Sequence, residues 1–268
     1  MTTAGKKGRP AQSRYAALVE KVFFDRYSKD ATAIDFVRQD LKRAAAALAI
    51  ELPENLGDVL YSMRFRTPMP ASVRAAQPAG YEWIIELAGQ AKYRFRLVRE
   101  NRIVPNPNLV RIRIPDNTPE IITAYALDDE QALLAKVRYN RLIDIFLGLT
   151  TFSLQNHLRT TAKGIGQIEI DELYVGIDRF GCHYTIPVQA KGGNDQISVV
   201  QTVQDLAWCA QRFAGLRCRP ISAQFVAADR IALFELVADG DEIRVVDEKH
   251  YQLVASHELD AKELSAYR

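Results

Sequence analysis

The segment that most constrains the fold runs from Gln167 to Lys191, where two apolar, strand-like stretches flank a tight turn. The turn, Asp178 to Cys182, suits a three-residue hairpin loop in which Gly181 takes the left-handed backbone conformation. We centre the hairpin on Phe180, which fixes the residues that face each other across its strands. Because both faces are rich in apolar side chains, we expect the hairpin to lie inside a sheet that is covered on both sides.

Polar side chains converge at the open end of this hairpin. In the predicted register Asp171 lies opposite Gln189 and Glu169 lies opposite Lys191, and all four share one face because side chains alternate along a strand. Buried carboxylates without partners are unfavourable, so a cation is expected nearby. Carboxylate and amide oxygens suit Mg²⁺ or Mn²⁺, and a lysine beside them can stabilise negative charge on a phosphate. The structural alternative is a buried Glu169–Lys191 ion pair without catalysis.

Asp171, followed by a hydrophobic strand and then by Gln189-Ala190-Lys191, resembles the PD-(D/E)xK superfamily of restriction-endonuclease-like nucleases. The resemblance covers roughly residues 131–246. It implies an α/β/α core with a central mixed sheet, an Asp on the second core strand and a (D/E)xK motif on the third. It also implies a helix over 195–213, a strand over 219–227, and Mg²⁺-dependent hydrolysis of DNA phosphodiesters.

The sequence departs from the family pattern at three positions. Gln189 stands where the motif has an acid, Ile170 replaces the proline before the aspartate, and Pro187 removes a backbone donor from a strand expected to be central. A register shift at Pro187 would bring Glu172 into competition with Glu169 as the second acid. The resemblance thus assigns the metal to Asp171, Glu169, Gln189 and the Ala190 carbonyl, and assigns water or phosphate to Lys191.

The N-terminal part has a different organisation. Helices are predicted over 15–27, 33–50 and 56–66, followed by a hairpin over 81–87 and 92–99. This order resembles a winged-helix domain, which implies that the third helix enters the DNA major groove while the hairpin contacts the backbone. The candidate DNA-binding residues are Tyr61, Arg64 and Arg66 on that helix, and Lys92, Arg94 and Arg96, which alternate with apolar residues on the second strand. The alternative is an exposed strand face whose basic residues discourage edge pairing.

Charge is unevenly distributed along the 268 residues. Residues 1–165 hold 25 Lys and Arg against 17 Asp and Glu, a net charge of +8, whereas 166–268 hold 10 against 16, a net charge of −6. A basic first half and an acidic second half favour a DNA-gripping module joined to a cation-binding one. Chance asymmetry on solvated faces is the alternative.

These observations predict four segments: a disordered basic tip over 1–14, a winged-helix-like domain over 15–104, a proline-rich linker over 105–127 and a nuclease domain over 128–268. We expect the last to open with a helix from about residue 131 to 146 that breaks near Gly148 and resumes to about 157. Accessory site candidates are Gln155 and His157 before the hairpin, and Gln201 and Gln204 on the helix after it.

The predicted function is that of a metal-dependent DNA endonuclease of restriction type, which uses Mg²⁺ or Mn²⁺ on double-stranded DNA as a homodimer. Two alternatives stay open: a catalytically inactive DNA-binding or regulatory protein, and a structure-specific repair nuclease. The three cysteines lack metal-ligand spacing and suit reduced thiols, and no signal or membrane segment is evident, so a cytoplasmic location is expected.

Overall fold

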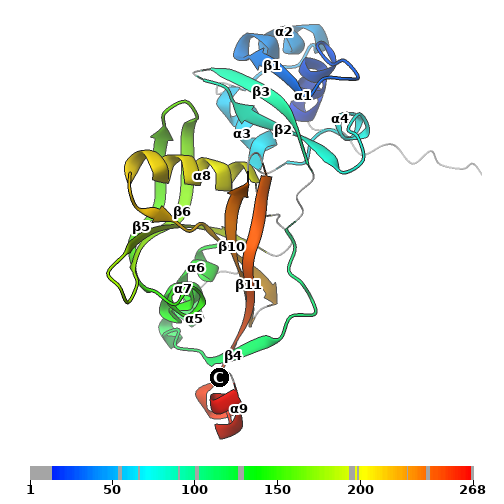
Figure 1. Ribbon diagram of the computed structural model, residues 1–268. Helices are drawn as coiled ribbons and strands as arrows, with labels where there is room; N and C mark the ends of the chain where they lie inside the picture. The colour runs from blue at the N-terminus through cyan, green and yellow to red at the C-terminus, as the bar shows by residue number, and fades with distance from the viewer. Residues whose placement is uncertain are drawn as a thin grey trace, which may run out of the picture. The chain divides into compact units, whose positions relative to one another are not determined.

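The computed structural model describes residues 14–53, 56–65, 67–89, 91–99, 103–125, 130–192, 197, 199–227, 229–239 and 242–266. It shows a mixed α+β protein that divides into two compact units, Met1–Glu100 and Asn101–Arg268 (Figure 1). Each unit is described by itself. Residues 1–13 of the predicted tip, and Arg66, lie outside the described residues.

The first unit packs helices against a small antiparallel sheet of strand order β1-β3-β2. Its buried core includes Phe23, whose ring meets those of Trp83 and Phe95 edge-on at 5.1 Å between centroids. Its elements are α1 (Arg14–Phe24), β1 (Ala33–Val37), α2 (Arg38–Leu48), α3 (Leu56–Phe65), α4 (Ala71–Ala75), β2 (Tyr81–Leu87) and β3 (Lys92–Arg99).

The prediction of a helix over 33–50 is wrong in its first five residues, which form β1. Ile34 and Phe36 are buried and Asp35 between them is exposed, which is the period of a strand. The helix begins only at Arg38, where Asp40 Oδ2 accepts a hydrogen bond of 2.8 Å from the Val37 N–H. The alanine-rich run that follows is a strong helix former and extended the predicted helix too far toward the N-terminus.

The second unit is built on a curled mixed sheet of strand order β4-β11-β10-β9-β7-β6-β5, with β8 beside β7. Figure 1 shows the sheet curling around α6 and α7 while α8 crosses its other face. The elements are β4 (Arg111–Pro115), α5 (Glu120–Tyr125), α6 (Glu130–Tyr139), α7 (Leu142–Leu147), β5 (Thr150–Ala162), β6 (Gly166–Ile177), β7 (His183–Lys191), α8 (Val199–Arg212), β8 (Arg217–Cys218), β9 (Ile221–Ala227), β10 (Arg230–Asp239), β11 (Glu242–Val254), the 3-10 helix η1 (Ser256–Glu258) and α9 (Ala261–Ala266).

Two segments of this unit differ from the sequence expectation. The stretch 150–157, expected to resume a helix, is the first half of β5, because Gly148 at φ 64° ends α7 and Thr150, Thr151 and Phe152 favour a strand. The segment 105–127, expected as a linker, contains β4, which pairs in parallel with β11 at the sheet edge, and α5. Within the described residues, every helix is too short or too polar to cross a membrane.

The β6–β7 hairpin has the register predicted from its turn. Glu172 pairs with Val188, and the pairing continues without a shift to Ile177 and His183. Pro187 pairs with Leu173 and lies between the β7 residues that pair with β8 and those that pair with β9. Pro187 therefore interrupts neither the β7–β8 ladder nor the β7–β9 ladder.

Candidate functional site

The candidate site lies where β6 and β7 separate. The β6–β7 ladder ends at Glu172 and Val188. Past this pair, toward Glu169 on β6 and Lys191 on β7, side chains take the place of the backbone partners in the other strand. The Ala190 N–H donates to Asp171 Oδ2 at 2.8 Å, and Gln189 Nε2 donates to the backbone oxygen of Glu169 at 3.0 Å. Over the same residues β7 pairs in parallel with β9. The two strands thus diverge on one side of β7, and polar groups fill the space between them. We call this region, formed by Glu169, Asp171, Gln189, Ala190 and Lys191, the fork.

Asp171 lies at the centre of this fork and is only partly exposed. Burial raises the pKa of its carboxyl, while the Ala190 N–H and the Lys191 ammonium oppose the rise. Glu169 adds to the rise of the Asp171 pKa by repulsion, and His157 opposes it. The predicted pairs Asp171–Gln189 and Glu169–Lys191 lie beyond the last paired residues of the β6–β7 ladder, Glu172 and Val188, and Glu169 pairs with Arg159 instead.

The two charged residues beside Asp171 are themselves held in place. Lys191 Nζ donates to Gln201 Oε1 at 2.8 Å, which ties the end of β7 to the first turn of α8. Glu169 pairs with Arg159 of β5 at 3.2 Å. These contacts hold the Lys191 ammonium and the Glu169 carboxylate in place, and they put Gln201 of α8 in contact with Lys191.

Gln189 is 4% exposed, and its amide nitrogen is shared between two acceptors. One is the Glu169 carbonyl, and the other is Asp205 Oδ2 at 2.8 Å. Asp205 comes from α8, is 1% exposed, and has a pKa that burial raises well above its usual range. Sequence reasoning omitted Asp205 from the site. The signal that could have found it is its spacing, one helical turn after Gln201 on the same face of α8.

Glu172, the alternative second acid, is engaged elsewhere. Its fully buried carboxylate accepts hydrogen bonds from Arg138 Nε at 2.8 Å and from Ser153 Oγ at 2.6 Å. The register shift that would have favoured Glu172 over Glu169 does not occur at Pro187. We therefore infer that Glu172 anchors α6 to the sheet.

His157 occupies an unusual backbone position in β5. It falls between the register pairs Asn156–Glu172 and Leu158–Ile170, opposite Asp171, and its φ is 46°. A side-chain-bearing residue at positive φ stores strain, and such strain clusters at functional sites. The exposed imidazole is therefore the accessory candidate of β5 with the best placement. The other, Gln155, is exposed and pairs with Leu173, while Gln204 of α8 is buried.

The donor groups at the fork are oxygens. Among the described residues, no group of three or more His, Cys, Asp or Glu side chains is arranged to hold a metal ion. The fork instead offers the carboxylates of Asp171 and Glu169 together with Gln189 Oε1, which is buried without a hydrogen-bond partner. A carboxylate on β6 and an orphaned amide oxygen on the neighbouring β7 are oxygen donors of the kind that suits Mg²⁺, which is commonly held by one or two carboxylates with several waters.

The predicted DNA-binding residues of the first unit have varied surroundings. Tyr93 and Phe95 are buried, which confirms the alternation that turns Lys92, Arg94 and Arg96 outward. Arg94 binds Asp35 through two hydrogen bonds of 2.6 and 3.2 Å, and Arg96 binds Glu86 at 2.8 Å.

On α3, Arg64 donates to the Ile85 carbonyl at 3.3 Å, and burial lowers its pKa to about 10. Tyr61 on the same helix is 36% exposed. Lys92 and Tyr61 are exposed, while Arg64 supports the packing of α3 on β2.

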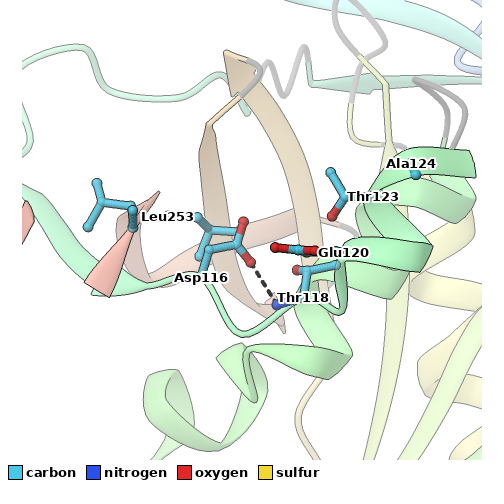
Figure 2. Close-up of a pocket in the computed structure, with 8 residues that line it drawn as sticks. Asp116, Thr118, Glu120, Thr123, Ala124 and Leu253 are labelled. Carbon is cyan, nitrogen blue, oxygen red and sulfur yellow. Dashed lines mark hydrogen bonds between the residues drawn. The ribbon is translucent and has the colours of Figure 1, made fainter. Parts of the chain in front are cut away.

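Comparison of the chain with models of protein families, with curated proteins and with solved structures finds no match. A hollow of about 510 Å³ lies elsewhere in the second unit, between the start of α5 and the end of β11 (Figure 2). There the Thr118 N–H donates to Asp116 Oδ1 at 2.8 Å, and Glu120 and Leu253 line the wall. None of the residues lining this hollow belongs to the fork.

Proposed function

We propose that this protein is a metal-dependent DNA endonuclease of restriction type. The observation that carries the proposal is the hydrogen bond from the Ala190 N–H to Asp171 at the point where β6 and β7 separate, with Gln189 and Lys191 on either side of Ala190 in β7. A carboxylate, an amide oxygen and an ammonium at one sheet edge are the groups needed to bind a divalent cation and a phosphate.

The order of elements supports the same proposal. β5, β6 and β7 are consecutive antiparallel strands, α8 follows, and β9 returns parallel to β7. Asp171 is on the second of these strands and Lys191 on the third, as the PD-(D/E)xK resemblance requires. Helices α6 and α7 pack on one face of the sheet and α8 packs on the other (Figure 1).

The residues would divide the chemistry as follows. Asp171 and Gln189 Oε1 would hold Mg²⁺ or Mn²⁺, with Glu169 as second acid and the Ala190 carbonyl as a further oxygen. When bound, such an ion polarises a phosphate and lowers the pKa of a coordinated water. Lys191, oriented by Gln201, stabilises the charge that develops on the phosphate. An amide in place of the motif acid removes one negative charge, which lowers the affinity for the metal.

The first unit supplies DNA binding in this proposal. Helices α1, α2 and α3, followed by the short α4 and the β2–β3 hairpin with its outward row of basic residues on β3, support a winged-helix-like module. Arg94 and Arg96 would exchange Asp35 and Glu86 for phosphates on binding, so affinity should fall steeply with salt. Cutting both strands of a duplex requires two sites, which a symmetric homodimer provides.

Cleavage of a substrate panel tests this function. Supercoiled, linear, methylated, branched and single-stranded DNA would be incubated with the full chain in Mg²⁺ or Mn²⁺, with Asp171→Ala and Lys191→Ala as inactivated variants. Lys262→Ala, at an exposed position of α9, is the matched control for the loss of a lysine. We expect duplex cleavage by the wild type and the control only.

The other outcomes each decide an alternative. A wild type inert on every substrate overturns the enzyme and leaves a DNA-binding protein. Cleavage confined to branched DNA replaces the restriction role with a structure-specific one. Cleavage that survives Asp171→Ala removes the fork as the active site.

A further inference from the structure

Gln189 and Asp205 form a buried pair between β7 and α8. Both side chains are more than nine-tenths buried, and Gln189 Nε2 donates to Asp205 Oδ2 at 2.8 Å. The same nitrogen donates to the Glu169 carbonyl. Turning the amide over would set its oxygen against these two oxygens, so the two acceptors fix which end of the amide is which.

With its nitrogen held in this way, the Gln189 amide has a buried oxygen that is free to accept. Gln189 Oε1 has no hydrogen-bond donor, and neither have Asp205 Oδ1 nor the hydroxyl of Ser222, which pairs with Gln189 across β7 and β9. A buried polar atom without a partner costs about 1–3 kcal/mol. Native proteins keep few such atoms, and each one calls for a partner such as a bound ion or a water.

We propose that Asp205 is a positioning residue, which orients the Gln189 amide so that its oxygen is presented to a bound divalent cation. This inference rests on the proposed function and deepens it. Glutamine, unlike the acid of the motif, has a donor end as well as an acceptor end, so it can serve as a ligand only when something holds its nitrogen away. Asp205 and the Glu169 carbonyl do so through the two hydrogen bonds of the amide nitrogen. Asp205 thereby compensates from α8 for the missing carboxylate on β7.

Asn and Leu at position 205 separate positioning from other roles. Asp205→Asn keeps an oxygen that can accept from Gln189 Nε2, whereas Asp205→Leu removes the acceptor at similar size. We expect Asp205→Leu to weaken Mn²⁺ binding to the full chain, measured by titration calorimetry, by about 10–100-fold, the usual effect of losing a residue that orients a ligand. Asp205→Asn should rescue most of this loss. If Asp205→Leu does not fold, Asp205→Ala removes the same acceptor without added bulk.

A double-mutant cycle gives the readout that a merely structural role would not move. If Asp205 acts through the amide, Asp205→Leu adds no further loss of Mn²⁺ affinity once Gln189→Leu is present. Additive losses overturn the inference, as does unchanged affinity in Asp205→Leu. Equal losses in Asp205→Asn and Asp205→Leu overturn it in favour of Asp205 as a ligand through its own charge.

The binding assay also separates this inference from the proposed function. A wild type that binds Mn²⁺ with the predicted coupling but cuts no DNA contradicts the nuclease and leaves the positioning role standing. If the wild type cuts DNA in Mg²⁺ but Asp205→Leu binds Mn²⁺ as tightly as the wild type, the positioning role is overturned and the nuclease proposal stands. A wild type that binds no Mn²⁺ overturns the inference, and its cleavage in Mg²⁺ then decides the nuclease proposal.

Discussion

Replacing Asp171 with asparagine should stabilise the protein while abolishing the proposed DNA cleavage. Burial raises the pKa of the Asp171 carboxyl, so its charged form is less favourable in the folded chain than in the unfolded one. A group of this kind contributes stability that is complete below its unfolded pKa and is lost as pH rises through its folded pKa. Near neutral pH the ionised Asp171 therefore opposes folding.

The structure limits what the substitution would lose. Asparagine keeps an oxygen that can accept the 2.8 Å hydrogen bond from the Ala190 N–H. Attraction to Lys191 disappears, but so does repulsion from Glu169, and burial is the largest influence on the Asp171 pKa. We expect a gain of about 0.5–2 kcal/mol, the usual size of a single stabilising substitution. Each kcal/mol corresponds to about 2–4 °C in Tm for a unit of this size.

The change in the free energy of unfolding can be measured by urea unfolding of the wild type and of Asp171→Asn. The two pH values, about 8 and about 3.5, lie above and below the ordinary pKa of aspartate. The gain should be present at the higher pH and absent at the lower. Asp30→Asn, at an exposed position of the first unit, is the control for the change in net charge. A gain of equal size at both values, or a loss of stability at the higher one, would refute the reasoning.

Three further predictions concern residues outside the fork. Arg138→Leu should lower the free energy of unfolding by about 3–5 kcal/mol, because Glu172 then stays buried without its ion-pair partner. Adding Glu172→Leu should restore much of the lost stability, and urea unfolding measures both changes. Asp35→Asn should release Arg94 and strengthen duplex binding with a steeper salt dependence; an unchanged fluorescence-anisotropy titration would place β3 outside the DNA interface. A maleimide should label exposed Cys182 in the native protein and buried Cys209 only after denaturation, as mass spectrometry would read out.

The parts of the fold that depend on local chemistry could be predicted from the sequence. The β6–β7 register follows from its turn, where Asp178 accepts hydrogen bonds from the N–H groups of Phe180 and Cys182, and Gly181 has a φ of 82°. Strands that depend on partners distant in the sequence could not be predicted in this way. β1 exists because it pairs with β3, and neither that pairing nor its effect on an alanine-rich neighbour is visible in a local pattern.

The candidate site divides in the same way. The position of Asp171, Gln189 and Lys191 at the open end of the β6–β7 hairpin could be predicted from its turn, because the register is regular up to Glu172 and Val188. Asp205 and the Arg138–Glu172 pair depend on how α8 and α6 are rotated against the sheet, which hydrophobic periodicity does not specify to within one residue. The partner of Arg94 was missed for a related reason, because Asp35 lies on β1, a strand that the sequence pattern did not indicate.

The most direct test of the central claim is the single-turnover cleavage of supercoiled plasmid in Mn²⁺ by wild type, Lys191→Ala and Lys262→Ala. The fork predicts cleavage that EDTA abolishes, a rate at least about 100-fold lower in Lys191→Ala, and a rate equal to wild type in Lys262→Ala. Cleavage by Lys191→Ala at the wild-type rate would contradict the assignment of this site.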